Sequence, residues 1–222
     1  MGFIAGVEAR ALPVRQAILD HPFVRGIGRG DLDLDRFRHY IAQDYVYLID
    51  YGRVLALGAA RAPELETMSW FAGLLDETLN TEMELHRGYC AQFGISRQEL
   101  EATRPAPTTV AYTSYLVRVA SQGSFGELAA SLLPCQWGYW EIGEHLLRQG
   151  PPDNTPLYAE WIGMYSSAEF RDLALHLRTL TDRIGSSASR EEQIAMENAY
   201  MTSLRLERQF WDMAWTLEQW PA

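Results

Sequence analysis

The chain has 222 residues, of which 47% are hydrophobic and 22% charged, and this balance provides for an ample core. Its net charge of −10 argues against nucleic acid or an anionic membrane as a partner, since both require a basic face. All 19 basic residues are arginine. A chain without lysine cannot be a Schiff-base enzyme, and it has no phosphate-loop lysine.

No apolar run approaches the ~20 residues that a membrane-spanning helix needs. The first residues lack a basic region followed by a long apolar segment, so we expect no signal peptide. Two cysteines, Cys90 and Cys135, cannot form a disulfide framework. We therefore expect a cytoplasmic protein.

Helical periodicity recurs along the chain, whereas strand patterns are nearly absent. Glycine- and proline-rich breaks separate the periodic segments, and no composition shift or internal repeat marks a second domain. Residues 1–222 are therefore predicted to form a single all-α domain, a helical bundle. We predict helices at about 5–20, 33–60, 64–93, 107–122, 125–149, 166–185 and 189–218, with short turns at about 96–103 and 155–162.

One glycine-rich segment, "GIGRG" at 26–30, is similar to a dinucleotide-binding loop. That motif needs a preceding strand and a following helix, and no strand pattern precedes it here. We predict a plain loop.

Two carboxylates interrupt the apolar stripes of predicted helices. Asp44 lies in the middle of the stripe of the second helix, beside Tyr47, and Glu207 lies between Leu204 and Trp211 on the last helix. Burying an unpaired carboxylate costs several kcal/mol, so each must find a partner or a ligand. A structural explanation for either one alone is a hydrogen bond to a buried tyrosine hydroxyl.

A thiol occupies a similar position in "LLPCQWGYWEIGEHL", residues 132–146. Cys135 and Tyr139 are one turn apart and so face the same way. Pro134 removes a backbone donor and kinks the helix, and Gly138 suits a close approach. Alone, Cys135 is explained as a small apolar core residue.

Together these residues predict a pocket for a small, flat, polar heterocycle. Tyrosines supply stacking faces and hydroxyls, and Tyr112 and Tyr165 join those named above. Carboxyl groups can form hydrogen bonds with the amino group and the ring nitrogen at the edge of an aminopyrimidine-like ring. The thiol supplies a nucleophile.

A metalloprotein is one alternative, because carboxylate–histidine sites in helical bundles hold di-iron centres. The Glu-x-x-His spacing of such sites is absent, and i, i+4 pairs are ordinary helix-surface partners. A second alternative is a non-catalytic binding protein. Among the i, i+4 pairs are Glu82/His86, Glu141/His145 and Asp172/His176, the first of them on an apolar stripe with Leu75, Leu79 and Cys90.

The sequence resembles the TenA family, also called thiaminase II. The resemblance rests on "AQDYVYL", "LLPCQWGYWEIGEHL", "MYSS" and "LERQFWDMAW", in this order along nearly the whole chain. It implies a haem-oxygenase-like bundle, a homotetramer, and no metal or organic cofactor. It further implies hydrolysis of 4-amino-5-aminomethyl-2-methylpyrimidine, and of thiamin, to 4-amino-5-hydroxymethyl-2-methylpyrimidine for thiamin salvage.

The resemblance also implies roles for site residues. Cys135 would be the nucleophile, and Asp44 and Glu207 would bind and protonate the pyrimidine. The pocket-lining tyrosines would be Tyr47, Tyr112, Tyr139 and Tyr165.

The implied hydrolysis can proceed by covalent catalysis. A thiolate that adds to an electron-poor ring carbon disrupts aromaticity, and the electron-rich ring then expels a leaving group from the exocyclic methylene. A carboxyl group held protonated by apolar surroundings can donate to the ring nitrogen as charge builds there.

Overall fold

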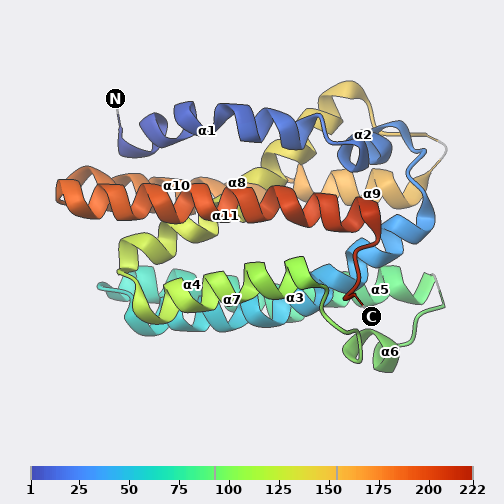
Figure 1. The fold of residues 1–222 in the computed structure, drawn as a ribbon, viewed down its shortest axis with the longest axis horizontal. Helices are drawn as coiled ribbons and strands as arrows, with labels where there is room; N and C mark the ends of the chain where they lie inside the picture. Colours follow the sequence, from blue (N-terminus) through green and yellow to red (C-terminus); the bar gives the residue numbers. More distant parts are fainter. Residues whose placement is uncertain (1, 93, 154, 222) are drawn as a thin grey trace. The chain divides into compact units, whose positions relative to one another are not determined.

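The computed structural model describes residues 2–92, 94–153 and 155–221. Within these ranges every regular element is a helix, which confirms the predicted all-α class (Figure 1). The short turns expected near 96–103 and 155–162 are the helices α6 (Arg97–Glu101) and α9 (Pro156–Tyr165). None of the helices described is long and apolar enough to cross a membrane.

Contacts between helices divide the chain into two compact units. The first comprises Met1–Asp33 with Gly126–Trp211, and the second comprises Leu34–Phe125 with Asp212–Ala222. The expectation of a single domain over residues 1–222 stays a prediction.

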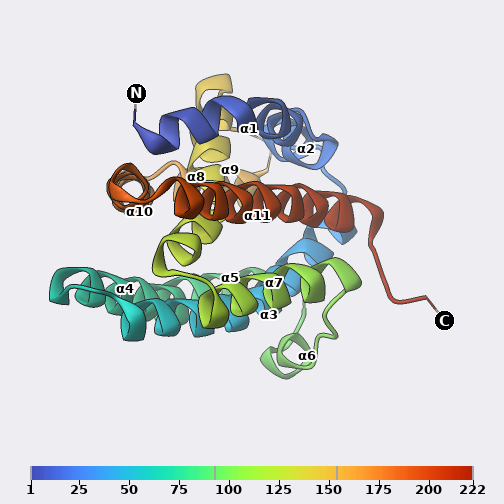
Figure 2. The ribbon, with the colours of Figure 1, turned by 60° about the vertical axis from the view of Figure 1, so that its left-hand side comes forward.

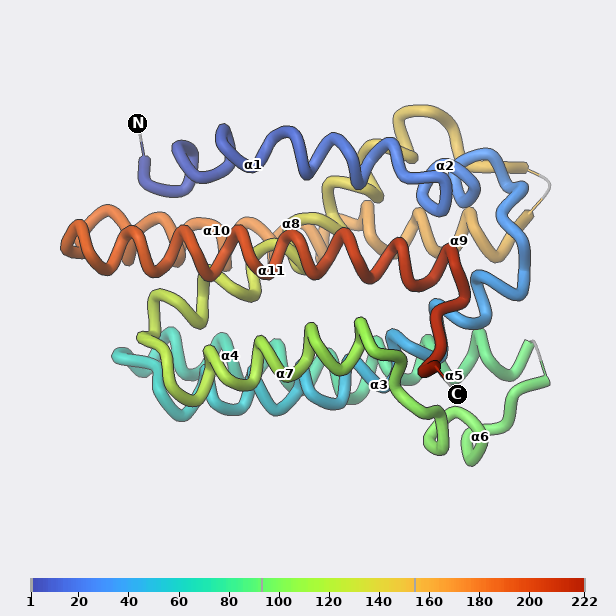
Figure 3. The backbone as a smooth tube through the Cα atoms, in the orientation of Figure 1, coloured from blue at the N-terminus to red at the C-terminus, as the bar shows by residue number. Residues whose placement is uncertain are grey.

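The first unit contains α1 (Phe3–Leu19), α2 (Pro22–Arg29), α9, α10 (Ala168–Ser187) and most of α8 (Phe125–Gln149) and α11 (Arg190–Thr216). Helix α1 packs along α10 (Figure 1). Both guanidinium donors of Arg178 on α10 bind the carboxylate of Glu8 on α1, at 2.8 and 2.7 Å. Figure 3 shows the backbone of α8 running as one helix, although Pro134 lies inside it.

The loop predicted at "GIGRG" is wrong, because α2 covers residues 22–29. The Nδ1 atom of His21 accepts from the Phe23 backbone N–H and caps the helix, and Pro22 occupies its first turn. Gly30 then ends it with a left-handed φ of 73°. Burial of Phe23 and Ile27 outweighs the low helix propensity of the two internal glycines.

The second unit is built on α3 (Leu34–Arg61). Helices α4 (Leu65–Glu77) and α7 (Pro107–Gln122) run along it (Figures 1 and 2). Helix α5 (Met83–Gln92) also packs on α3, and α6 follows it.

The single helix predicted at 64–93 is instead three consecutive segments. Between α4 and α5 lies one π-helical stretch, η1 (Thr78–Glu82). Leu79, which was expected on the buried stripe, lies within η1 and is 40% exposed, whereas His86 and Cys90 further along that stripe are buried. Position 93 lies outside the described residues.

Candidate functional site

Four of the predicted site residues lie in the first unit. Cys135 is half-buried on α8 and is not part of a disulfide, and Tyr139 follows it one turn later. Tyr165 is the last residue of α9, and Glu207 is buried on α11. The unit therefore contains a thiol, a buried carboxyl group and two buried tyrosines.

Aromatic rings bring three of these helices together. The ring of Tyr139 on α8 lies 4.7 Å from that of Tyr165 on α9 and 5.4 Å from that of Trp211 on α11, measured between centroids. Trp161, which the sequence analysis did not single out, packs 4.6 Å from Tyr165 and 6.1 Å from Tyr139. The result is a continuous aromatic cluster one turn from Cys135.

Gly143 allows this close approach of α8 and α9. A Cβ atom on Gly143 would lie 2.6 Å from the carbonyl carbon of Tyr165 and 2.7 Å from the backbone nitrogen of Ser166. By contrast, a Cβ on Gly138 would meet nothing within 4 Å. The close approach expected at Gly138 is therefore not made by the protein there, and Gly143 is the glycine that positions Tyr165.

The other three predicted residues lie in the second unit. Asp44 and Tyr47 are one turn apart on α3, and both are buried. The ring of Tyr47 lies 5.1 Å from that of Tyr112 on α7 and 5.8 Å from that of Tyr51, with which it stacks. Asp44 is thus beside a row of tyrosine rings.

The partner of Asp44 is a histidine and not a tyrosine hydroxyl. Its Oδ2 lies 2.7 Å from Nε2 of His86 on α5, and the imidazole is fully buried. Burial lowers the pKa of His86, but the hydrogen bond and charge of Asp44, with the charge of Glu82, raise it above its ordinary value. The sequence analysis placed His86 on an apolar stripe but offered it only as half of a metal-binding pair.

The carboxylates of the other two candidate metal pairs have arginine partners. Glu141 binds Arg15 through two hydrogen bonds, and Asp172 binds Arg171. His86 contacts the backbone carbonyl of Glu82. Over the residues that the structure describes, no group of three or more His, Cys, Asp or Glu side chains could hold a metal ion.

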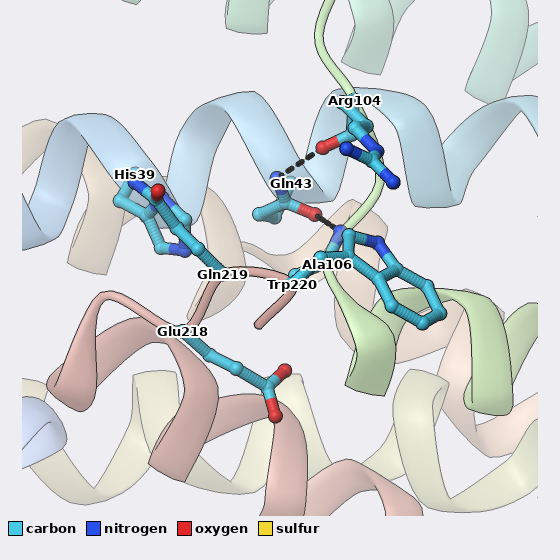
Figure 4. A pocket seen from close by; sticks show the side chains of 7 residues that line it. All are labelled: His39, Gln43, Arg104, Ala106, Glu218, Gln219 and Trp220. Atoms are coloured by element: carbon cyan, nitrogen blue, oxygen red, sulfur yellow. Dashed lines mark hydrogen bonds between the residues drawn. The ribbon is translucent and has the colours of Figure 1, made fainter. Parts of the chain in front are cut away.

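A cavity of about 350 Å³ lies elsewhere in the second unit, between α3, the segment that precedes α7 and the C-terminal segment (Figure 4). The Gln43 side chain donates to the Arg104 carbonyl and accepts from the Ala106 N–H. Trp220 donates to the Pro105 carbonyl. None of the predicted site residues lines this cavity; the residues that do are His39, Gln43, Arg104, Ala106, Glu218, Gln219 and Trp220.

The two groups of residues supply different chemistry. The first unit offers a thiol that can attack an electrophilic carbon and a buried carboxyl group that can exchange a proton. The second offers a buried carboxyl group that can accept hydrogen bonds and tyrosine rings that can stack on a flat ring.

Comparison with known proteins points to the same chemistry. The TENA/THI-4/PQQC family profile matches residues 8–217. An aminopyrimidine aminohydrolase from Halalkalibacterium halodurans is 46% identical over 220 residues, which cover 99% of this chain and 98% of that protein.

Solved structures agree with the fold. The structure of a TenA family transcription regulator from a Silicibacter species is 31% identical, with a TM-score of 0.89 and 96% of each chain covered. A Shewanella denitrificans domain with a heme oxygenase-like fold has a TM-score of 0.77 over 96% of this chain and 92% of that one. At 16% identity it bears on the fold alone, and it confirms the haem-oxygenase-like class. The chain therefore belongs to the TENA/THI-4/PQQC family.

Proposed function

We propose that the protein is a cofactor-independent aminopyrimidine aminohydrolase of thiamin salvage. It converts 4-amino-5-aminomethyl-2-methylpyrimidine to 4-amino-5-hydroxymethyl-2-methylpyrimidine, and it cleaves thiamin at the same methylene. The near full-length identity to an aminopyrimidine aminohydrolase supports this activity. The structural observation that carries it is the thiol of Cys135 one turn from the Tyr139 cluster, in a unit that also buries Glu207.

The reaction begins when the Cys135 thiolate forms a bond to a ring carbon of the pyrimidine. Glu207 gives its proton to a ring nitrogen, which takes up the electron pair displaced from the ring. The electron-rich ring then expels ammonia from the protonated aminomethyl group, or the thiazole of thiamin, and a double bond forms between the ring and the exocyclic methylene carbon. Water adds to that carbon and loses a proton to solvent. The ring nitrogen returns its proton to Glu207 and the thiolate leaves, so that aromaticity returns.

The remaining predicted residues bind the substrate. Asp44 accepts a hydrogen bond from the exocyclic amino group of the pyrimidine. The tyrosines Tyr47, Tyr112, Tyr139 and Tyr165 contact its ring and edges.

A hydrolysis assay on metal-stripped protein tests the proposal against its two alternatives. Turnover of thiamin or of the aminomethylpyrimidine without added metal is the expected result. Turnover that requires added iron would support a di-iron enzyme, and tight binding without turnover would support a non-catalytic binding protein.

We also propose that the protein is a cytoplasmic homotetramer. A thiol nucleophile suits a reducing compartment, and neither Cys90 nor Cys135 forms a disulfide. Apolar residues on the surface of α4, of which Leu65 is 81% and Met68 40% exposed, supply area for an interface between copies. Light scattering on the purified protein would measure the mass of the assembly.

A further inference from the structure

The buried pair of Asp44 and His86 has a geometry that the proposed reaction does not yet explain. The side chains are 6% and 1% exposed, and 2.7 Å separates Oδ2 of Asp44 from Nε2 of His86. The other ring nitrogen, Nδ1, lies 2.8 Å from the backbone carbonyl oxygen of Glu82. Both nitrogens of the imidazole therefore face an oxygen atom.

These contacts fix the number of protons on the pair. A carbonyl oxygen only accepts, so Nδ1 of His86 carries a hydrogen. A second proton lies between Nε2 and Oδ2, because two lone pairs would repel at this distance. The pair is thus imidazolium with carboxylate or imidazole with carboxylic acid, and it is neutral overall in both forms. An aspartic acid is ordinarily a stronger acid than an imidazolium, which favours the first form.

This arrangement leaves one oxygen of Asp44 for another partner. Within the described part of the chain, the Asp44 side chain makes its hydrogen bond through Oδ2, to His86. In the carboxylate form, Oδ1 can accept hydrogen bonds but cannot donate them. An exocyclic amino group, which donates, is the matching ligand group.

We propose that His86 is a positioning residue for substrate binding, which holds Asp44 in one rotamer and balances its charge so that Oδ1 stays an acceptor for the amino group of the pyrimidine. This role rests on the function proposed above. Without a cation beside it, a buried carboxylate is costly and tends to take up a proton, which turns one oxygen into a donor.

The local backbone supports this role. The π-helical stretch η1 ends at Glu82, the residue whose carbonyl fixes the imidazole ring. π turns are rare and occur often at functional sites. The charged groups that act on His86 are Asp44 on α3 and Glu82 on η1. Arg87, next to it on α5, is bound instead to Glu84 and to the Tyr45 hydroxyl.

Ligand titration of two variants tests the proposal. In a Cys135→Ser background, which prevents turnover, 4-amino-5-hydroxymethyl-2-methylpyrimidine is titrated by calorimetry at pH 6 and pH 8. We expect His86→Phe to raise the Kd at least about tenfold, the usual effect of disturbing a buried polar contact, and more at pH 6 than at pH 8. His86→Gln should recover part of the affinity, because its amide can still donate to Oδ2. His145→Gln, at a less buried imidazole bonded to Gln149, is the matched control and should bind normally.

A double-mutant cycle decides whether His86 acts through Asp44. If it does, the Asp44→Ala/His86→Phe double variant binds as weakly as Asp44→Ala alone. Additive losses would overturn the proposal. Nitrogen NMR of histidine-labelled wild type, which needs no variant to fold, should show hydrogens on both ring nitrogens of His86 at pH 7, and a bare Nδ1 would overturn it.

The outcomes also separate this role from the proposed function. A wild-type protein that neither binds nor hydrolyses the pyrimidine overturns the function, and the positioning role with it. Normal wild-type turnover together with an unchanged Kd in His86→Phe overturns the positioning role alone.

Discussion

The hydroxyl group of Ser203 on α11 donates a 2.6 Å hydrogen bond to the carbonyl oxygen of Ser131 on α8, and both residues are fully buried. Ser131 lies one turn before Cys135, and Ser203 lies one turn before Glu207. From this contact, α8 continues to Cys135 and α11 continues to Glu207. The hydrogen bond therefore sets the register between the turn that carries the nucleophile and the turn that carries the acid.

Removing the Ser203 hydroxyl should affect both stability and turnover. We expect Ser203→Ala to lower the free energy of unfolding by about 1–3 kcal/mol, since a buried hydrogen bond is lost. We expect kcat to fall more than KM rises, because the register of Glu207 is relaxed. Urea unfolding and steady-state kinetics measure the two effects. Ser121→Ala is the control: its hydroxyl makes a similar bond to Val117, but on an exposed helix face. Equal effects of the two variants would contradict the prediction.

Two glycines on α8 should respond oppositely to alanine. Gly143→Ala would press a methyl group into the backbone of Tyr165 and Ser166, so we expect a loss of about 1–3 kcal/mol and a higher KM. Gly138→Ala meets no neighbour and should gain about 1 kcal/mol from helix propensity. Urea unfolding of both variants checks this. A Gly143→Ala variant as stable as Gly138→Ala would show that α8 and α9 can separate without cost.

Helical periodicity was enough to predict that the main site residues lie on the buried faces of their helices. Asp44 and Glu207 interrupt apolar stripes of long, regular helices, and both side chains are buried. A 3.6-residue period fixes facing as long as the helix is uninterrupted. Their catalytic roles stay predictions.

The contacts that the sequence did not reveal depend on tertiary packing. Asp44 and His86 are 42 positions apart, and the π turn before His86 leaves no mark on a periodic pattern. The close approach expected at Gly138 stays a prediction, and the close helix contact made at Gly143 was not predicted. The glycines of α2 predicted a loop because burial of the neighbouring apolar side chains cannot be read from local sequence.

Substitution of the thiol tests the assignment of the nucleophile. We expect Cys135→Ser to keep the fold, by circular dichroism, and to lose nearly all turnover, because a hydroxyl is a far weaker nucleophile at neutral pH. Cys90 is the matched control. Burial raises the pKa of its thiol to about 11, so it carries little thiolate, and Cys90→Ser should change stability alone. A Cys135→Ser variant that retains most of its rate would remove Cys135 from the mechanism.

The raised pKa of His86 predicts a pH-dependent contribution to stability. A histidine whose pKa is higher in the folded than in the unfolded state stabilises the fold fully below its unfolded pKa, about 6.5. That contribution is lost as the pH rises through the folded-state pKa. The difference in unfolding free energy between wild type and His86→Gln should therefore be largest near pH 6 and shrink at higher pH. Urea titrations from pH 6 to pH 9 measure it, and a difference that grows with pH would contradict the predicted direction.

Glu207→Gln separates proton transfer from binding. Glutamine keeps the shape of the buried side chain and a hydrogen-bond donor, so we expect the pyrimidine to bind with nearly normal affinity. It cannot deliver a proton to the ring nitrogen, so the single-turnover rate should fall by about 10²–10⁴, the usual contribution of a positioned general acid. A calorimetric titration and a single-turnover assay on the same variant measure both quantities. Normal turnover with intact binding would remove Glu207 from the mechanism. Lost binding would instead make Glu207 an anchor for the substrate, and the ring nitrogen would have to receive its proton from another group.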